Sequence, residues 1–279
     1  MNSLPKSAFF NVSVDGAVAR LEMNRPDKAN GMSPDFWRDL PELAKAIDAN
    51  PSMRCVVLSG AGRHFSGGMD LATFADINAI QENEPGRASY ALRDLILNLQ
   101  ASLSSLEEMR IPVVAVTHGA CLGGAIDLIT ACDVRIASAD TSFGIEEIQI
   151  GMAADVGTLQ RLPKLIPPGI VHELAYTGRR FSAVEAKAWG LVNAVHECRE
   201  AAIDAAMELA QSIAEKSPLA VAGIKRAITY ARDNTVANSL DQIATWNAGM
   251  LRPQDLISAM QAKMAKQQAT FDDLLKDTG

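Results

Sequence analysis

Short β-rich runs that alternate with helical patterns constrain the fold of this chain most strongly. The runs RCVVLSG (54–60) and PVVAVTHG (112–119) each end in glycine, and helical segments lie between and after them. Near the N-terminus, FFNVSVDGAVARLEMN alternates and turns at Asp15-Gly16, which predicts a hairpin. Strands that alternate with helices up to about Val195 indicate an α/β fold.

Capping residues predict where several helices begin. Ser33 before a proline predicts one start, and Asp70 is expected to cap a second helix, LATFADINAI. Ser182 with Glu185 forms a capping box, and Gly190 closes that helix. After His196 the chain is helical and Ala-rich, with apolar faces that need cover from the body of the fold or from another subunit.

Composition excludes several classes of protein. The net charge of −7 and pI near 5.2 give no general attraction to nucleic acid or anionic membranes. No apolar run reaches membrane-spanning length, and the N-terminus lacks the pattern of a secretory or transit peptide. We interpret the four cysteines, which show no C-x-x-C spacing, as reduced core residues of an intracellular protein: Cys55, Cys121, Cys132 and Cys198.

Two glycine pairs, in HFSGGMDL and in HGACLGGAIDL, each follow a strand and enter a helix. A Gly-Gly pair taken alone is explained by a tight turn. Two such turns in succession favour a second interpretation, in which free backbone amides converge on a carbonyl that becomes an oxyanion.

Five separated segments carry a family resemblance. They are ARLEMNRPDKANGMS, GAGRHFSGGMDL, THGACLGGAIDLITACDVRIAS, SFGIEEIQIGMAADVGTLQRLPKLI and ELAYTGRRFSAVEAKAWGLVNAV, and together they span roughly residues 10 to 198. The chain resembles the crotonase, or enoyl-CoA hydratase/isomerase, superfamily.

The resemblance implies a crotonase-like spiral of ββα units over residues 1–198 and a helical trimerisation region over 199–279. It implies an acyl-CoA substrate, no separate cofactor or metal, and a homotrimer or a hexamer built as a dimer of trimers. The thioester carbonyl would be held by the backbone amides of Met69 and Gly124. Coenzyme A would contact Lys28 and the segment of Ser66, Gly67, Gly68 and Asp70.

Three acids then bear on the reaction: Asp127, Glu147 and Asp155. Enoyl-CoA hydratases resemble this chain but have glutamate at the first two positions and glycine at the third, which puts water addition in doubt. The set Asp, Glu, Asp is similar to the dienoyl-CoA isomerases of fatty-acid β-oxidation. That resemblance implies that Asp155 removes a proton from C2 of a 3,5-dienoyl thioester, Glu147 delivers one to C6, and Asp127 orients or tunes the pair.

Each acid also has a structural interpretation from the residues alone. Asp155 is well placed to cap the helix that begins VGTLQRL, and Asp127 falls in a first helical turn, where the helix dipole favours a carboxylate. Glu146 and Glu147 point in opposite directions if their segment is extended, and spacing does not choose between them. Only the family register selects Glu147.

Other functions have weaker support. The histidines are scattered without metal-ligand spacing: His64, His118, His172 and His196. Ser66 lacks a nucleophile elbow, and no dinucleotide-binding fingerprint is present. The alternatives to an isomerase are an enoyl-CoA hydratase or another lyase of the superfamily, and a non-catalytic relative that binds acyl-CoA or RNA. The C-terminus LLKDTG is not a peroxisomal signal, so a cytoplasmic location is the default expectation.

Overall fold

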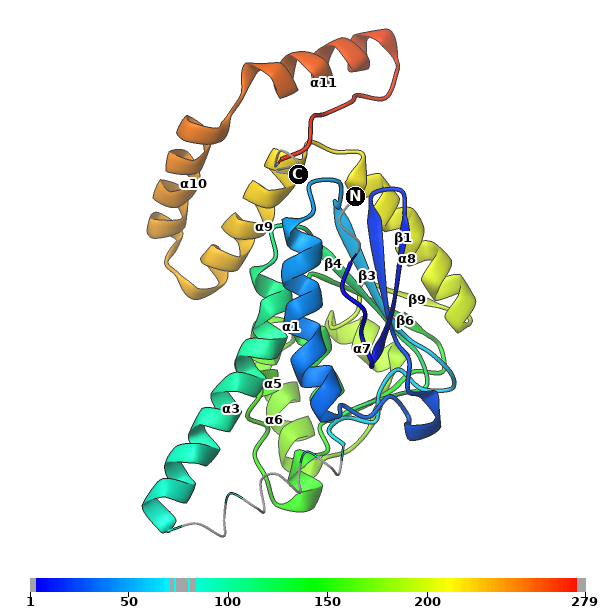
Figure 1. Ribbon diagram of the computed structural model, residues 1–279. Coiled ribbons are helices and arrows are strands. Elements are labelled where there is room, and N and C mark those ends of the chain that lie inside the picture. The colour runs from blue at the N-terminus through cyan, green and yellow to red at the C-terminus, as the bar shows by residue number, and fades with distance from the viewer. Residues whose placement is uncertain (1–3, 71–72, 74–79, 81–83, 275–279) are drawn as a thin grey trace.

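A six-stranded sheet forms the centre of the molecule (Figure 1). The computed structural model describes residues 4–70, 73, 80 and 84–274. The strand order is β1-β2-β3-β4-β6-β9, and only the β1/β2 pair is antiparallel. The strands are β1 (Phe10–Asp15), β2 (Val18–Met23), β3 (Cys55–Gly60), β4 (Val113–Thr117), β6 (Val134–Ser138) and β9 (Ala194–His196). The hairpin at Asp15-Gly16 and the strands within RCVVLSG and PVVAVTHG are confirmed.

A second, smaller sheet lies beside the carboxyl end of β4. It pairs β5 (Ala120–Leu122) with β7 (Ser142–Gly144) in parallel, and β7 with β8 (Phe181–Ser182) in antiparallel. The second glycine pair therefore follows the short strand β5, which the sequence did not predict, and not β4 directly. This strand carries the chain from the large sheet to the glycine turn.

Ten α-helices and three short 3₁₀ helices are described. They are α1 (Pro34–Ala49), α3 (Pro85–Glu108), α4 (Gly124–Thr130), α5 (Thr158–Arg161), α6 (Pro168–Thr177), α7 (Ala183–Trp189), α8 (Arg199–Ala214), α9 (Pro218–Asp233), α10 (Val236–Met250), α11 (Pro253–Ala265), η1 (Pro26–Lys28), η2 (Glu147–Ile150) and η3 (Leu162–Lys164). The helix start after Ser33 and the capping box of Ser182 with Glu185 are confirmed. The helix expected after Asp70 lies outside the described residues. None of the described helices is long and apolar enough to cross a membrane.

Both faces of the large sheet are covered, and β3 shows how. Val56 and Leu58 point into a core shared with α1 and α3, while Cys55 and Val57 point into a second core against α8. Alternate residues of one strand therefore enter different cores, and all six residues of β3 are buried. A sheet covered on both faces holds its carboxyl edge, where the glycine turns begin, in a fixed place.

The helical C-terminal region divides in two. Helix α8 packs on the sheet and belongs to the core, whereas α9, α10 and α11 extend away from it (Figure 1). Several large apolar side chains on the last three helices are exposed, among them Leu240 and Met260. The part that lies off the sheet thus begins at α9, and a domain boundary after residue 198 stays a prediction.

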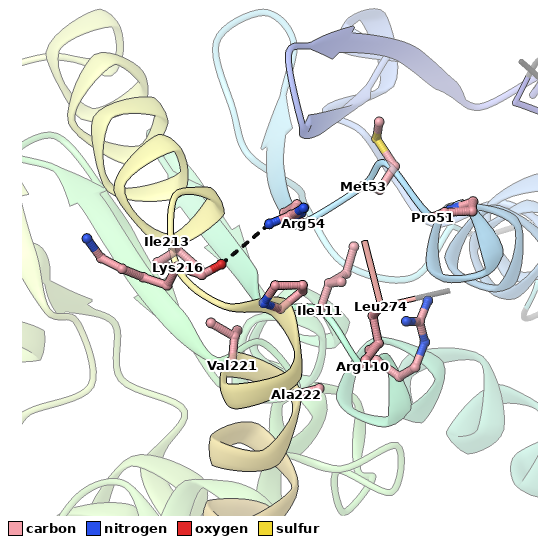
Figure 2. A pocket seen from close by; sticks show the side chains of 11 residues that line it. Pro51, Met53, Arg54, Arg110, Ile111, Ile213, Lys216, Val221, Ala222 and Leu274 are labelled. Carbon is pink, nitrogen blue, oxygen red and sulfur yellow. Dashed lines mark hydrogen bonds between the residues drawn. The ribbon is translucent and has the colours of Figure 1, made fainter. Parts of the chain in front are cut away.

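A small cavity lies at the amino ends of the parallel strands, opposite the edge that carries the glycine turns. Figure 2 shows it between the segments that precede β3 and β4 and the junction of α8 with α9. Arg54 donates hydrogen bonds to the carbonyl of Lys216 (3.5 Å) and to that of Phe271 (3.0 Å), and it pairs with Asp273 (2.7 Å). One arginine therefore ties the C-terminal segment to the body of the fold.

The cysteines only partly match their predicted placement. All four are free thiols, and Cys55, Cys121 and Cys132 are buried. Cys198 is exposed, so its assignment to the core is wrong. It directly precedes α8, at a point where the chain returns to the surface.

Candidate active site

The two glycine turns lie against each other. Gly68 has φ +92°, and a Cβ at this residue would be 2.7 Å from the carbonyl oxygen of Leu122 and 3.4 Å from the amide nitrogen of Gly124. A side chain at position 68 would therefore collide with the β5–α4 turn. Glycine lets the loop after β3 approach that turn closely.

This contact brings the amides of Met69 and Gly124 together. The position of a Cβ on Gly124 is 3.8 Å from the Met69 nitrogen. Met32 donates to the carbonyl of Gly68 (2.8 Å) and accepts from the amide of Asp70 (3.2 Å), which leaves the Met69 amide on the other edge of that segment. Neither the Met69 amide nor the Gly124 amide donates a hydrogen bond to any described residue. Two adjacent unused donors can hold one oxygen atom.

Asn30 holds the loop after β3 in place, and sequence reasoning missed it. Its side chain is fully buried and donates to the carbonyls of Ala61 (2.9 Å), His64 (2.9 Å) and Phe65 (3.1 Å). It also has φ +49°, a conformation that asparagine tolerates better than most residues. An asparagine before glycine in DKANG was the available signal.

Ser66 and Gly67, both expected to contact coenzyme A, form hydrogen bonds inside the protein. The Ser66 hydroxyl donates to the carbonyl of Asn30 (2.9 Å) and accepts from the amide of Gly68 (3.1 Å). The Gly67 amide donates to the carbonyl of Ala29 (2.8 Å). These bonds shape the loop, so any contact with a nucleotide would come from its surface.

Charged residues flank the same loop. Arg25 forms a close ion pair with Asp70 and also donates to the carbonyl of Gly31 (3.2 Å). Lys28 follows in η1 and is exposed, as is Arg63 on the neighbouring turn. The Lys28 side chain is therefore available to an anionic ligand.

Asp127 is the most deeply buried of the three acids. It lies on α4, its exposed fraction is 1%, and its carboxylate accepts a hydrogen bond from the amide of Thr158. Burial raises the pKa of Asp127 to about 6, in spite of that hydrogen bond. The negative charge of Asp155 acts in the same direction as burial.

Glu147, not Glu146, lies at the inner side of its segment. Glu146 forms a surface ion pair with Arg180 (2.8 Å). The Glu147 carboxyl lies beside the glycine turn, since a Cβ on Gly123 would be 3.4 Å from its Oε1. The idea of an extended segment is wrong here, because β7 ends at Gly144 and Glu147 begins η2.

The Glu147 carboxyl is set up to hold a proton. Its Oε2 is buried without a hydrogen-bond partner among the described residues. Burial raises the pKa of Glu147 to about 7, and the negative charges of Asp127 and Asp155 add to this effect. A carboxyl group with such a pKa is partly protonated at neutral pH and can act as a general acid.

Asp155 does not cap a helix. Gly157 is the N-cap residue of α5, and the first amide of that helix, from Thr158, is taken by Asp127. The backbone carbonyl of Asp155 accepts a hydrogen bond from Gln100 of α3 (2.6 Å), which sequence reasoning did not identify. Burial also raises the pKa of Asp155, although this residue is less enclosed than Asp127.

Two of the four histidines have roles in loop structure. His64 accepts from the amide of Ala120 (3.1 Å), and the His118 ring lies 3.0 Å from the carbonyl oxygen of Gly62. Within the described part of the chain, no group of three His, Cys, Asp or Glu residues is arranged to hold a metal ion.

Comparison with known proteins identifies the family. The family model "Enoyl-CoA hydratase/isomerase" matches residues 13–274. The chain belongs to the enoyl-CoA hydratase/isomerase family. The resemblance seen in the five sequence segments is confirmed, and so is the crotonase-like α/β fold.

Similar proteins include two named isomerases. The chain is 41% identical to the peroxisomal Δ(3,5)-Δ(2,4)-dienoyl-CoA isomerase of Arabidopsis thaliana, over 98% of this chain and 99% of that protein. It is 42% identical to the mitochondrial enzyme of that name from Homo sapiens, over 94% and 81% of the two chains. Among solved structures, an enoyl-CoA hydratase from Bacillus anthracis is 31% identical with a TM-score of 0.86, and the match covers 95% and 99% of the two chains.

Proposed function

We propose that this member of the enoyl-CoA hydratase/isomerase family is a dienoyl-CoA isomerase, which converts a 3,5-dienoyl-CoA into the conjugated 2,4-dienoyl-CoA in fatty-acid β-oxidation. The observation that carries the proposal is the cluster of Asp127, Glu147 and Asp155, whose charges influence one another beside two free backbone amides. The names of the Arabidopsis and human relatives support the same reaction.

The proposed reaction has two proton transfers. Asp155 takes a proton from C2, and the electrons move through the diene to give a dienolate. Glu147 then gives its proton to C6, and the double bonds end at positions 2 and 4. The reaction needs one ionised and one protonated acid, and burial beside like charges is what keeps a proton on Glu147 near neutral pH.

The amides of Met69 and Gly124 are proposed as the oxyanion hole. Hydrogen bonds to the thioester oxygen make the C2 proton more acidic and stabilise the dienolate, and each donor contributes on the order of 3 kcal/mol. Coenzyme A is part of the substrate, and we propose that Lys28 contacts it with Ser66, Gly67, Gly68 and Asp70 forming the wall of its site. No other cofactor is required by this mechanism.

We also propose that the chain assembles as a homotrimer, or as a hexamer of two trimers. Support comes from the exposed apolar side chains of α9, α10 and α11, which need a partner to cover them. The relatives are named peroxisomal and mitochondrial. For this chain a cytoplasmic location stays the proposal, and subcellular fractionation tests it.

The substrate test uses two thioesters side by side. The purified protein receives 3,5-octadienoyl-CoA, and the ultraviolet absorbance of the conjugated 2,4-dienoyl thioester is followed. Crotonyl-CoA hydration is measured in parallel. Growth of the dienoyl signal supports the isomerase. Loss of crotonyl-CoA with an unchanged dienoyl substrate would support a hydratase, the function named for the Bacillus structure.

A further inference from the structure

An arginine stands beside the three acids and is not part of the reaction as described above. Arg161 lies on α5, one turn after Thr158, whose amide donates a hydrogen bond to Asp127. The Arg161 side chain is 12% exposed. Asp127 has no other cationic group among its main electrostatic influences, which are otherwise Asp155 and the hydrogen-bonding Thr158. Arg161 is therefore the positive charge that most affects the pKa of Asp127.

Gly157 lets Arg161 approach Asp127. The position that a Gly157 Cβ would take is 2.0 Å from Arg161 Nη1 and 4.0 Å from Asp127 Oδ1. The cation and the carboxylate consequently lie within the roughly 6 Å over which an opposite charge favours ionisation. Gly157 has φ +142°, so both its conformation and the space beside it require glycine.

The far side of the guanidinium is fixed by α3. Arg161 Nη2 donates to the hydroxyl of Ser104 (2.9 Å) and to Glu107 Oε2 (3.3 Å). Glu107 also forms a close ion pair with Arg232 of α9. Burial alone would raise the pKa of Glu107, but its bonds to Arg232 and Arg161 lower it, so Glu107 stays ionised and keeps its hold on Arg161.

We propose that Arg161 is a positioning residue, held by Ser104 and Glu107, whose charge keeps Asp127 ionised and so leaves the proton of the site on Glu147. Three carboxyl groups share this site, and the proposed reaction needs the proton on Glu147. Without a cation beside Asp127, the proton is shared between Asp127 and Glu147. The fraction of molecules that carry the proton on Glu147 then falls. The inference rests on the proposed function for its kinetic consequence only.

The groups that face Asp127 predict the direction of the change. Arg161 lowers its pKa, whereas burial and the charge of Asp155 raise it. Glu147, the other neighbouring acid, is influenced by Asp127, Asp155 and Glu146. Removal of the Arg161 charge therefore raises the pKa of Asp127 and moves the acidic limb of the pH-rate profile to higher pH. The basic limb, which reports loss of the Glu147 proton, does not move to lower pH.

The experiment compares Arg161→Gln with Arg161→Lys by kcat at two pH values. An upward shift of about one pH unit in the acidic limb lowers kcat of the Gln variant by about fivefold at pH 6, with almost no change at pH 8. The Lys variant keeps a positive charge and is expected to lose less at pH 6. Arg179→Gln is the matched control, because Arg179 forms two ion pairs, with Glu173 and Glu185, away from the acids. It should leave both values unchanged.

A second readout does not depend on activity. The carboxyl carbon of Asp127 is followed by ¹³C NMR titration in the wild type and in the Arg161 variants. The pKa of Asp127 should rise in Arg161→Gln and stay near the wild-type value in Arg161→Lys. If the Gln variant does not fold, an Arg161→Lys variant with a shifted Asp127 titration overturns the proposal.

Two further results would overturn it. Arg161→Gln that loses the same factor of kcat at both pH values has lost structure and not proton placement. If the pKa of Asp127 in Arg161→Gln equals the wild-type value, the Arg161 charge does not control the ionisation of Asp127. A wild-type protein that does not isomerise a dienoyl-CoA at any pH defeats the proposed function instead, and the NMR titration then still decides the part played by Arg161.

Discussion

Glu147 and Asp155 have the same functional group, but their surroundings differ. Glu147 Oε2 is buried without a hydrogen-bond partner among the described residues, beside the negative charge of Asp127. Asp155 is less enclosed than Asp127 and does not cap the adjacent helix. The proposed roles of acid and base follow this difference in environment.

The first residue-scale prediction concerns proton donation. Because Glu147 must be protonated and its pKa is about 7, the wild-type rate should fall as pH rises through that value. Glu147→Gln cannot donate the proton, and kcat for the dienoyl substrate should drop by about 100-fold to 10,000-fold. The measurement is kcat between about pH 5 and pH 9.

Glu146→Gln is the matched control for this change. Its carboxylate pairs with Arg180 at the surface, so the variant should keep most of its activity. Equal losses in both variants would mean that the turn carrying the two glutamates has been disturbed and that Glu147 has no special part.

At the scale of elements, turn and capping patterns predicted contacts between residues that are close in the sequence. The hairpin at Asp15-Gly16 and the capping box of Ser182 depend on residues a few positions apart, and both are present. Strand β5 was not predicted, because it pairs with β7, which is distant in the sequence. The long helix α3 was also missed, although Glu84 and Pro85 mark its start.

The same distinction applies to the candidate site. The glycine pairs and the acids could be found from motifs, but the interpretation of Asp155 as a cap failed. The amide that it would have capped is bound by Asp127, 31 residues away in sequence. Gln100 and Arg161 act through contacts across the fold that no local pattern reveals, whereas Asn30 had a local signal in the asparagine before glycine of DKANG.

An element-scale prediction concerns how α9 is attached. Lys225 is 7% exposed, pairs with Asp133 (2.9 Å), and donates to the carbonyls of Leu106 (3.0 Å) and Ile111 (3.1 Å). Lys225→Met leaves these acceptors without their partner, so the free energy of unfolding should fall by about 3 kcal/mol or more. Urea denaturation followed by circular dichroism measures the change.

Lys45→Met is the control for this loss of charge, since Lys45 is exposed on α1. It should change the free energy of unfolding by less than about 0.5 kcal/mol. Similar unfolding curves for the two variants would show that Lys225 does not anchor α9.

At the scale of the whole molecule, one edge of the sheet and one set of helices have separate tasks. The carboxyl edge carries the glycine turns and the acids, while α10 and α11 extend away from the sheet (Figure 1). Several large apolar side chains on these two helices are exposed. Arg232 of α9 connects the two regions. It forms an ion pair with Glu107, and Glu107 also binds Arg161, which lies beside Asp127. One chain of charged contacts therefore links α9 to α5.

The whole-molecule prediction concerns assembly. The double variant Leu256→Glu, Met260→Glu places charges on the exposed apolar face of α11, where the side chains are 46% and 63% exposed. Sedimentation velocity should show a trimer or hexamer for the wild type and smaller species for the variant. Val184→Glu on α7, also at an exposed position, serves as the control and should keep the wild-type assembly. A monomeric wild type would contradict the proposal.

The most direct measurement is the rate at which Asp155→Asn converts 3,5-octadienoyl-CoA into the absorbing 2,4-dienoyl thioester, compared with the wild type. Asparagine keeps the size of the side chain but cannot accept the C2 proton. We expect kcat to fall by about 100-fold to 10,000-fold, with unfolding curves unchanged. An Asp155→Asn variant that isomerises at the wild-type rate would contradict the assignment of the base and, with it, the proposed mechanism.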